Sequence, residues 1–133
     1  MVRYKELKYE GKVYNEQYKI DEILIKNKFE WFLDTEVENI RLEIVKDILV
    51  VNSGIWYNGI FVYGVIRDLE WRFGSFENGI IHNIIWRNGI FKNGIIYGGI
   101  FYQGQFISGE IKREGAKTEF INCDISPNFK QNL

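Results

Sequence analysis

Residues 54–113 read GIWYNGIFVYGVIRD, LEWRFGSFENGIIHN, IIWRNGIFKNGIIYG and GIFYQGQFISGEIKR when they are written in lines of fifteen. Each line holds three five-residue units, and every unit carries one large apolar residue. Glycine stands two places before that residue in ten of the twelve units, and Leu69 and Ile84 replace it in the other two. The large residues form an unbroken series: Trp56, Phe61, Ile66, Trp71, Phe76, Ile81, Trp86, Phe91, Ile96, Phe101, Phe106 and Ile111.

The five-residue period excludes both a flat strand and a helix. Side chains of a strand alternate between its two faces, so residues five apart would face opposite sides of a sheet. In a helix the same spacing moves around the axis, and each glycine would cost about 1 kcal/mol. All the large residues can share one side only if the chain turns a corner in every unit. The repeat therefore predicts an all-β fold, a β-solenoid in which glycine either points inward beside the large residue or supplies a positive φ at the corner.

The fifteen-residue superperiod predicts which inner side chains stack if three units make one turn. Inner residues of the same type would then stack on one another in successive turns. Aromatic side chains stacked in this way pack favourably. The predicted columns are Trp56, Trp71, Trp86 and Phe101; Phe61, Phe76, Phe91 and Phe106; and Ile66, Ile81, Ile96 and Ile111.

An antiparallel meander is the alternative fold. Asparagine precedes glycine at Asn58, Asn78, Asn88 and Asn93, and Asn-Gly is a strong hairpin-turn dipeptide. A glycine turn every five residues would, however, leave only three-residue strands, which are shorter than usual in sheets.

The units resemble the pentapeptide-repeat family, in which a small residue, any residue, Leu or Phe, any residue, and often Asn, Asp or Gly follow one another. GIFKN at residues 89–93 matches that register, as does CDISP at residues 123–127. The resemblance spans residues 54–125, with a break between Ile111 and Phe120. It implies solenoid architecture. The family's coil is four-sided, whereas a fifteen-residue superperiod suggests three sides, so the number of sides stays open. The motif W-x-N-G-x-F also resembles MORN repeats, the known family that corresponds to the antiparallel meander.

Length and composition limit the class of protein. The chain has 133 residues, 46% of them hydrophobic, and a net charge of -1, which indicates one compact domain and gives no electrostatic reason to expect nucleic acid. No apolar run is long enough to cross a membrane, and the start lacks a secretory signal. We expect a cytoplasmic protein. Abundant Ile, Asn and Lys beside one Pro and one Ala suggest a low-GC bacterium or a phage as the source.

The two flanks are predicted to cap the solenoid. Residues 1–53 read as a β region, with a half-buried strand over residues 29–38 and a hairpin around Lys46 and Asp47. Covering an end of a solenoid hides its unpaired strand edge and its apolar cross-section. Residues 114–133 form the other cap or tail, with Pro127 and Asn128 closing the last strand.

No group of residues predicts catalysis, a metal site or a cofactor site. His82 is the one histidine and is expected to point outward. Cys123, the one cysteine, takes the small inward position of a unit and is expected to be buried. Acidic residues between Glu30 and Glu38 could serve glycoside hydrolysis, but they are more simply the solvated face of a strand. We therefore expect a protein that is not an enzyme and has no small-molecule substrate.

The candidate binding surface lies on the outside of the solenoid. Eight aliphatic residues are expected to point outward, and a monomer seldom exposes so much apolar area. Either residues 1–53 cover them, or they contact another protein or another copy of the chain. The residues after the inner position add a Tyr and Arg column, and both types are favoured in interfaces. The predicted binding residues are Tyr57, Arg72, Arg87, Tyr102, Ile85 and Ile90.

Three functions are compatible with such a surface. The first is protein-protein interaction or structural assembly. The second is inhibition of a DNA-handling or host-defence enzyme, since some pentapeptide-repeat proteins resemble duplex DNA. Residues 54–113 contain four acidic and six basic residues, which argues against DNA mimicry. The third is carbohydrate binding on Tyr57, Tyr97 and Tyr102.

Overall fold

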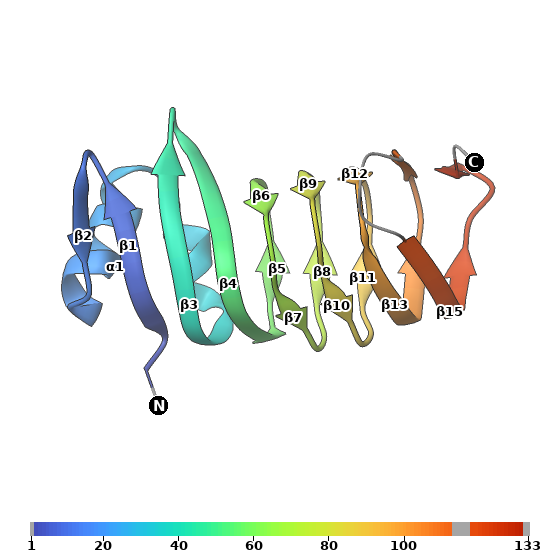
Figure 1. Cartoon of the computed structure of the whole chain (residues 1–133), viewed down its shortest axis with the longest axis horizontal. Coiled ribbons are helices and arrows are strands. Elements are labelled where there is room, and N and C mark those ends of the chain that lie inside the picture. The colour runs from blue at the N-terminus through green and yellow to red at the C-terminus, as the bar shows by residue number, and fades with distance from the viewer. Residues whose placement is uncertain (1, 113–117, 132–133) are drawn as a thin grey trace.

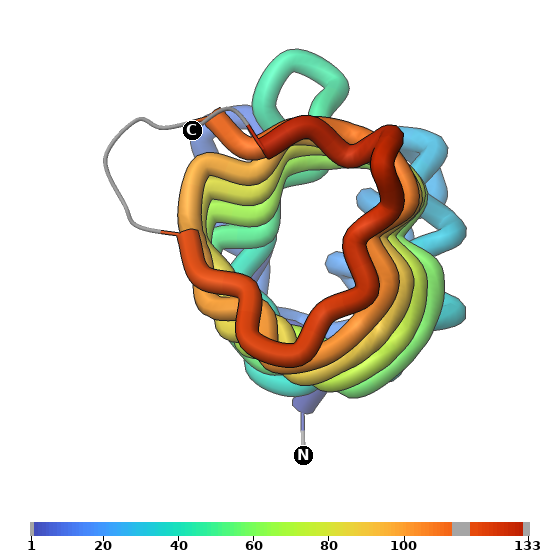
Figure 2. The backbone as a smooth tube through the Cα atoms, turned by 90° about the vertical axis from the view of Figure 1, so that its right-hand side faces the viewer, coloured from blue at the N-terminus to red at the C-terminus, as the bar shows by residue number. Residues whose placement is uncertain are grey.

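The computed structural model describes residues 2–112 and 118–131, and within them the chain forms a β-solenoid with a non-repetitive N-terminal region. The N-terminal elements lie at one end, and successive turns follow along the long axis of the molecule (Figure 1). Viewed along that axis, the turns lie one behind another around one closed outline (Figure 2).

Three parallel sheets form the sides of the solenoid, and each is named here after its inner residues. The Trp face contains the second half of β4 (Ile48–Asn58), β7 (Glu70–Trp71), β10 (Ile85–Trp86) and the first half of β13 (Gly99–Phe106). The Phe face contains β5 (Ile60–Phe61), β8 (Ser75–Phe76), β11 (Ile90–Phe91) and the second half of β13. The Ile face contains the start of β4, β6 (Val65–Ile66), β9 (Ile80–Ile81), β12 (Ile95–Ile96), β14 (Gly109–Ile111) and β16 (Phe129–Gln131).

The strand register fixes the number of sides at three. On the Trp face, Trp56 pairs with Trp71, Trp71 with Trp86, and Trp86 with Phe101, always in parallel and fifteen residues apart. The other two faces repeat the same offset. The predicted solenoid is confirmed, and the antiparallel meander is wrong because the repeat strands pair in parallel with the next turn.

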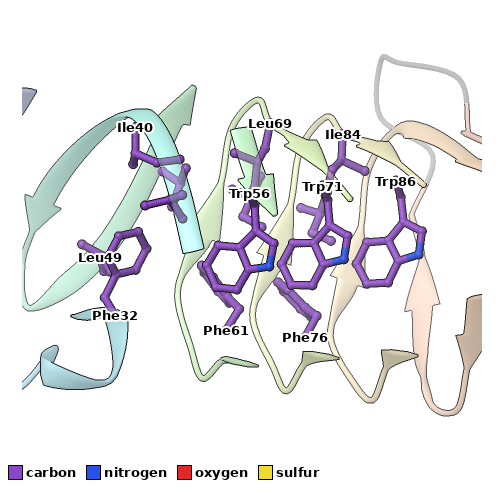
Figure 3. Close-up of a cluster of buried hydrophobic side chains, with 14 of the residues drawn as sticks. Phe32, Ile40, Leu49, Trp56, Phe61, Leu69, Trp71, Phe76, Ile84 and Trp86 are labelled. Atoms are coloured by element: carbon purple, nitrogen blue, oxygen red, sulfur yellow. The ribbon is translucent and has the colours of Figure 1, made fainter. Parts of the chain in front are cut away.

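The inner side chains stack in the predicted columns. The ring centroids of Trp56 and Trp71 are 4.6 Å apart and those of Trp71 and Trp86 are 4.7 Å apart, with nearly parallel planes (Figure 3). Phe61, Phe76 and Phe91 stack in the same way at 5.0 and 5.1 Å. Each such pair adds about 0.5–1.5 kcal/mol to the gain from burial.

The first two tryptophans of this column also donate hydrogen bonds, and the third does not. Trp56 Nε1 donates to the carbonyl of Phe73, and Trp71 Nε1 donates to that of Asn88, each at 3.1 Å. Trp86 Nε1 is buried and has no acceptor among the described residues. Its ring also meets Phe101 at a tilt of 43°, because the indole series ends there.

This difference predicts unequal effects of two similar substitutions. Trp71→Phe removes a hydrogen bond and the parallel indole stacking on both sides, whereas Trp86→Phe removes a buried donor that has no acceptor. We expect Trp71→Phe to lower the free energy of unfolding by about 1 kcal/mol more than Trp86→Phe. Urea denaturation followed by circular dichroism would measure this difference, and equal losses would contradict it.

Leu69 and Ile84, the two exceptions to the glycine rule, lie at the corner between the Ile face and the Trp face. Both are buried, in line with Ile40 of the N-terminal region (Figure 3). A side chain at Gly99 would lie 2.8 Å from Ile84 Cγ2, and one at Gly54 would lie 2.7 Å from Ile40 Cδ1. Larger residues therefore fill this corner in the middle turns and leave room only for glycine in the turns next to them.

The corner between the Trp face and the Phe face requires glycine for its backbone as well. Gly89 has a φ of +132°, and a Cβ there would lie 2.3 Å from the carbonyl oxygen of Gly74 in the preceding turn. That contact is with backbone, which cannot move without breaking the sheets on both sides.

Gly89→Ala is therefore expected to lower the free energy of unfolding by more than about 2 kcal/mol. Gly11→Ala is the matched control, because Gly11 also has a positive φ, of +76°, but has nothing within 4 Å of an added Cβ. It should cost about 1 kcal/mol. Urea denaturation of the two variants would test this, and an equal cost would show that the contact with Gly74 does not matter.

The N-terminal region contains β1 (Tyr4–Tyr9), β2 (Lys12–Tyr14), α1 (Gln17–Lys26), η1 (Glu30–Asp34) and β3 (Glu36–Val45). β3 pairs with β4 in antiparallel, and Lys46 and Asp47, both at positive φ, make the predicted hairpin turn between them. The helix departs from the expected β region, since Ile20 and Leu24 are buried on one helical face. The Tyr4 hydroxyl of β1 donates to Asp21 of α1 at 2.5 Å.

The predicted strand over residues 29–38 is wrong in its first half. Residues 30–34 form the 3-10 helix η1, and Phe29 and Phe32, three apart, are both buried. The ring of Phe32 meets Trp56 edge to face at 6.0 Å, so it covers the first turn of the solenoid core. Alternation along the sequence assigned Phe32 to solvent, whereas burying it against Trp56 requires the tighter helical spacing.

The C-terminal segment adds a further turn to the solenoid. β15 (Thr118–Ile125) pairs in parallel with β13, and β16 pairs with β14. The offset rises from fifteen residues to nineteen where Gly99 pairs with Thr118, and to twenty where Gly109 pairs with Phe129. Pro127 and Asn128 form a turn between β15 and β16, and residues 114–117, 132 and 133 of the predicted cap lie outside the described residues. The repeat also begins earlier than Gly54, since Val50 pairs with Val65.

None of the helices in the described part of the chain is long and apolar enough to cross a membrane.

Candidate functional site

The predicted column of Tyr57, Arg72, Arg87 and Tyr102, called the Tyr–Arg ladder here, lies on the outer surface of the Trp face. Each member follows an inner residue of that face, so the register places one member on each successive turn. Adjacent strands lie about 4.8 Å apart. Arg72 Cζ lies 4.9 Å from the ring centroid of Tyr57, and Arg87 Cζ lies 5.2 Å from that of Tyr102. The ladder is thus two cation-π pairs.

The first pair is fixed by carboxylates on both sides. The Tyr57 hydroxyl donates to Glu38 Oε1 of β3 at 2.7 Å, and Arg72 Nε donates to Glu70 Oε2 at 2.8 Å. The hydrogen bond to Glu38 raises the pKa of Tyr57, burial raises it further, and the Arg72 charge opposes both. Glu38 therefore links the N-terminal region to the ladder, and no periodic signal in the sequence indicated this contact.

Replacing Glu38 by Gln should lower the pKa of Tyr57 toward the ordinary tyrosine value of about 10. The amide can still accept the hydrogen bond, but it no longer opposes formation of the phenolate by its charge. Titration of the Tyr57 ring signals by NMR would measure the change. Glu43→Gln, on the same strand but bonded to Asn52, is the control and should leave Tyr57 unchanged; an equal shift in both variants would contradict the assigned cause.

The second pair differs in its charge. Arg87 stacks on Tyr102, but no carboxylate among residues 2–112 and 118–131 forms an ion pair with it. In the unit that carries Arg87, the outward residue before the inner Trp86 is Ile85, whereas the preceding turn has Glu70 at that position. The ladder thus presents a neutralised cation in one turn and an uncompensated cation in the next.

The structure places five of the six predicted binding residues together. Ile85 lies on the Trp face beside the ladder and is 41% exposed. Ile90 is 37% exposed but belongs to the Phe face, around the corner formed by Asn88 and Gly89. The N-terminal region closes the end of the solenoid and does not cover either isoleucine. The alternative that residues 1–53 cover the outer aliphatic residues is therefore wrong for this part of the surface.

Ile121 extends the Trp face by one more turn and was not among the predicted residues. It is 57% exposed and lies on β15 between the residues paired with Phe101 and Gln103 of β13, next to Tyr102. The five-residue register could not place it, because the offset between turns changes to nineteen residues there.

The tyrosines predicted for carbohydrate binding do not form one site. Tyr57 and Tyr102 lie on the Trp face under arginines, whereas Tyr97 lies on the Ile face. The ring of Tyr97 stacks against His82 at 5.2 Å. Each of the three rings thus already has a neighbour on one of its faces.

The other candidate residues are accounted for by packing. His82 is exposed, as predicted. Cys123 is half-buried, lies opposite Gly104 in the strand pairing, and has its thiol 3.3 Å from the carbonyl oxygen of Phe101. Burial raises the pKa of the Cys123 thiol, and this opposes the formation of a reactive thiolate. The acidic residues 30–38 are divided between η1 and β3. Among the described residues, no three histidine, cysteine or acidic side chains are grouped as a metal site.

No protein-family model matches the chain, and no curated protein and no solved structure matches it. Arguments about its function therefore depend on its own residues and their geometry.

Proposed function

We propose that the chain is a non-enzymatic module that binds a protein through the Trp face. The observation that carries this proposal is the Tyr–Arg ladder, which forms a row of stacked side chains beside the exposed Ile85. Tyrosine and arginine dominate the binding energy of many interfaces, and both are most effective when an apolar surface surrounds them.

The rigidity of this surface favours binding. Each arginine of the ladder rests on a tyrosine ring, and the backbone below is held in a parallel sheet. Side chains that are already ordered lose less conformational entropy when a partner contacts them. A flat protein surface can therefore use these residues at a low entropic cost.

The charges indicate the chemistry of the partner. Arg72 is neutralised by Glu70, whereas Arg87 lacks a carboxylate among the described residues. A partner that places a carboxylate over Arg87 and an apolar side chain over Ile85 would complement both. The partner is either a second copy of the chain or a different protein with an acidic patch.

A paired comparison of variants tests the proposal. Arg87→Ala with Tyr102→Ala removes half of the ladder. Arg67→Ala with Tyr97→Ala removes the same residue types from the same place in the unit, but on the Ile face. Light scattering over a dilution series would detect self-association, and capture from a lysate of the encoding organism would detect a different partner.

We expect the ladder variant to weaken the association at least tenfold, and the control variant to behave like the unmodified chain. An equal effect of both double variants would contradict the assignment of the Trp face. A monomer at all concentrations that captures no protein would contradict the proposed function itself.

A further inference from the structure

A second surface feature lies at the corner between the Phe face and the Ile face, the corner that does not border the Trp face. A groove of about 490 Å³ runs there along the solenoid axis, and it is called the asparagine groove here. Tyr63, Asn78, Asn93 and Ser108 line it, one from each successive turn, and Ile80 and Ile95 of the Ile face line its other side.

The two asparagines present amide groups to solvent in the groove. Asn78 Oδ1 accepts a hydrogen bond from the backbone nitrogen of Gly79 at 2.8 Å, and Asn93 Oδ1 accepts one from Ser108 Oγ at 3.3 Å. Each oxygen is thus held by the solenoid, and neither Nδ2 group donates to any of the described residues. The groove therefore contains two amide donors, one in each of two successive turns, and the bonds to their oxygens orient them.

The two donors are one turn apart. Adjacent turns lie about 4.8 Å apart, a length comparable to that of one pyranose residue in an extended sugar chain. Beside the donors, Ile80 and Ile95 repeat with the same spacing and offer an apolar strip. Sugar rings carry hydroxyl groups on their edges and C–H groups on their faces, so a row of amides beside a row of aliphatic side chains complements both.

An exposed aromatic side chain lies at one end of the groove. Tyr63 is 51% exposed and stacks on no other aromatic ring among the described residues, so its ring is available to a ligand. At the opposite end, the charges of Glu110 and Lys130 offset each other. The groove as a whole is thus close to neutral, which favours an uncharged ligand over a nucleic acid or an acidic polymer.

We propose that the asparagine groove binds a neutral, extended oligosaccharide with one sugar residue per turn of the solenoid. Tyr63 stacks on the sugar at one end, and the amides of Asn78 and Asn93 donate to hydroxyl oxygens of the sugars that follow. This site lies at the corner between the Phe face and the Ile face and includes none of Tyr57, Tyr97 and Tyr102, and it is independent of the Trp face.

Isothermal titration calorimetry with the full chain tests this proposal. The probes are cello-, xylo-, manno- and chito-oligosaccharides from the disaccharide to the hexasaccharide. Because four turns line the groove with Tyr63, Asn78, Asn93 and Ser108, affinity for the preferred series should rise up to the tetrasaccharide and then level off. Tyr63→Ala and the double variant Asn78→Ala with Asn93→Ala should each weaken binding at least tenfold.

The corner between the Trp face and the Phe face supplies matched controls. Phe73 at that corner is 52% exposed and so matches Tyr63, which is 51% exposed. Asn88 Oδ1 accepts a hydrogen bond from the backbone nitrogen of Gly89 at 2.8 Å, and this matches the bond from Gly79 to Asn78. Phe73→Ala and Asn88→Ala remove equivalent side chains outside the groove and should leave sugar affinity unchanged. Circular dichroism would confirm that all variants are folded.

Three results would overturn the proposal: no binding of any of the four hexasaccharides at millimolar concentration, equal losses at the two corners, or an affinity that does not depend on chain length. The double variant Arg87→Ala with Tyr102→Ala separates this site from the Trp face. It should bind sugar like the unmodified chain, so a failure of one proposal leaves the other open to its own test.

Discussion

The stacking of Trp56, Trp71 and Trp86 sets the register on which the rest of the structure depends. A shift of one five-residue unit would place indole rings against phenyl rings and would break the hydrogen bonds of Trp56 and Trp71 to backbone carbonyls. Like side chains therefore stack only at an offset of fifteen residues. Glycine at the corners permits this offset, since the backbones of successive turns approach too closely there for a Cβ.

The two ends of the solenoid differ in structure. At the first turn, β3 pairs with β4, Phe32 packs against Trp56, and Trp31 of η1 packs against Phe61 of β5, so the N-terminal region covers the aromatic core there. At the other end, β15 and β16 continue the sheets with a longer offset, and within the described residues they pair only with the preceding turn.

The inner columns constrain only one residue of each unit, and this leaves the outward residues free to differ between faces. The same five-residue unit thus yields a row of stacked tyrosines and arginines on the Trp face and a row of amides at the opposite corner. Both rows inherit their spacing from the core. A repeat of this kind produces linear surfaces without any dedicated loop, because each turn adds one side chain to each row.

The sequence by itself determined the coil and the hairpin at Lys46. It also predicted the inner columns and the succession of residues in the ladder, on the condition that three units make one turn, which the strand register then established. Each of these depends on spacing along the chain, which an odd period of apolar residues records directly. Only the tertiary structure decided that Phe32 is buried, that Glu38 binds Tyr57 and that Thr118 opens a further turn. These contacts join residues at separations that no period repeats, so their partners are chosen by packing in three dimensions and not by local pattern.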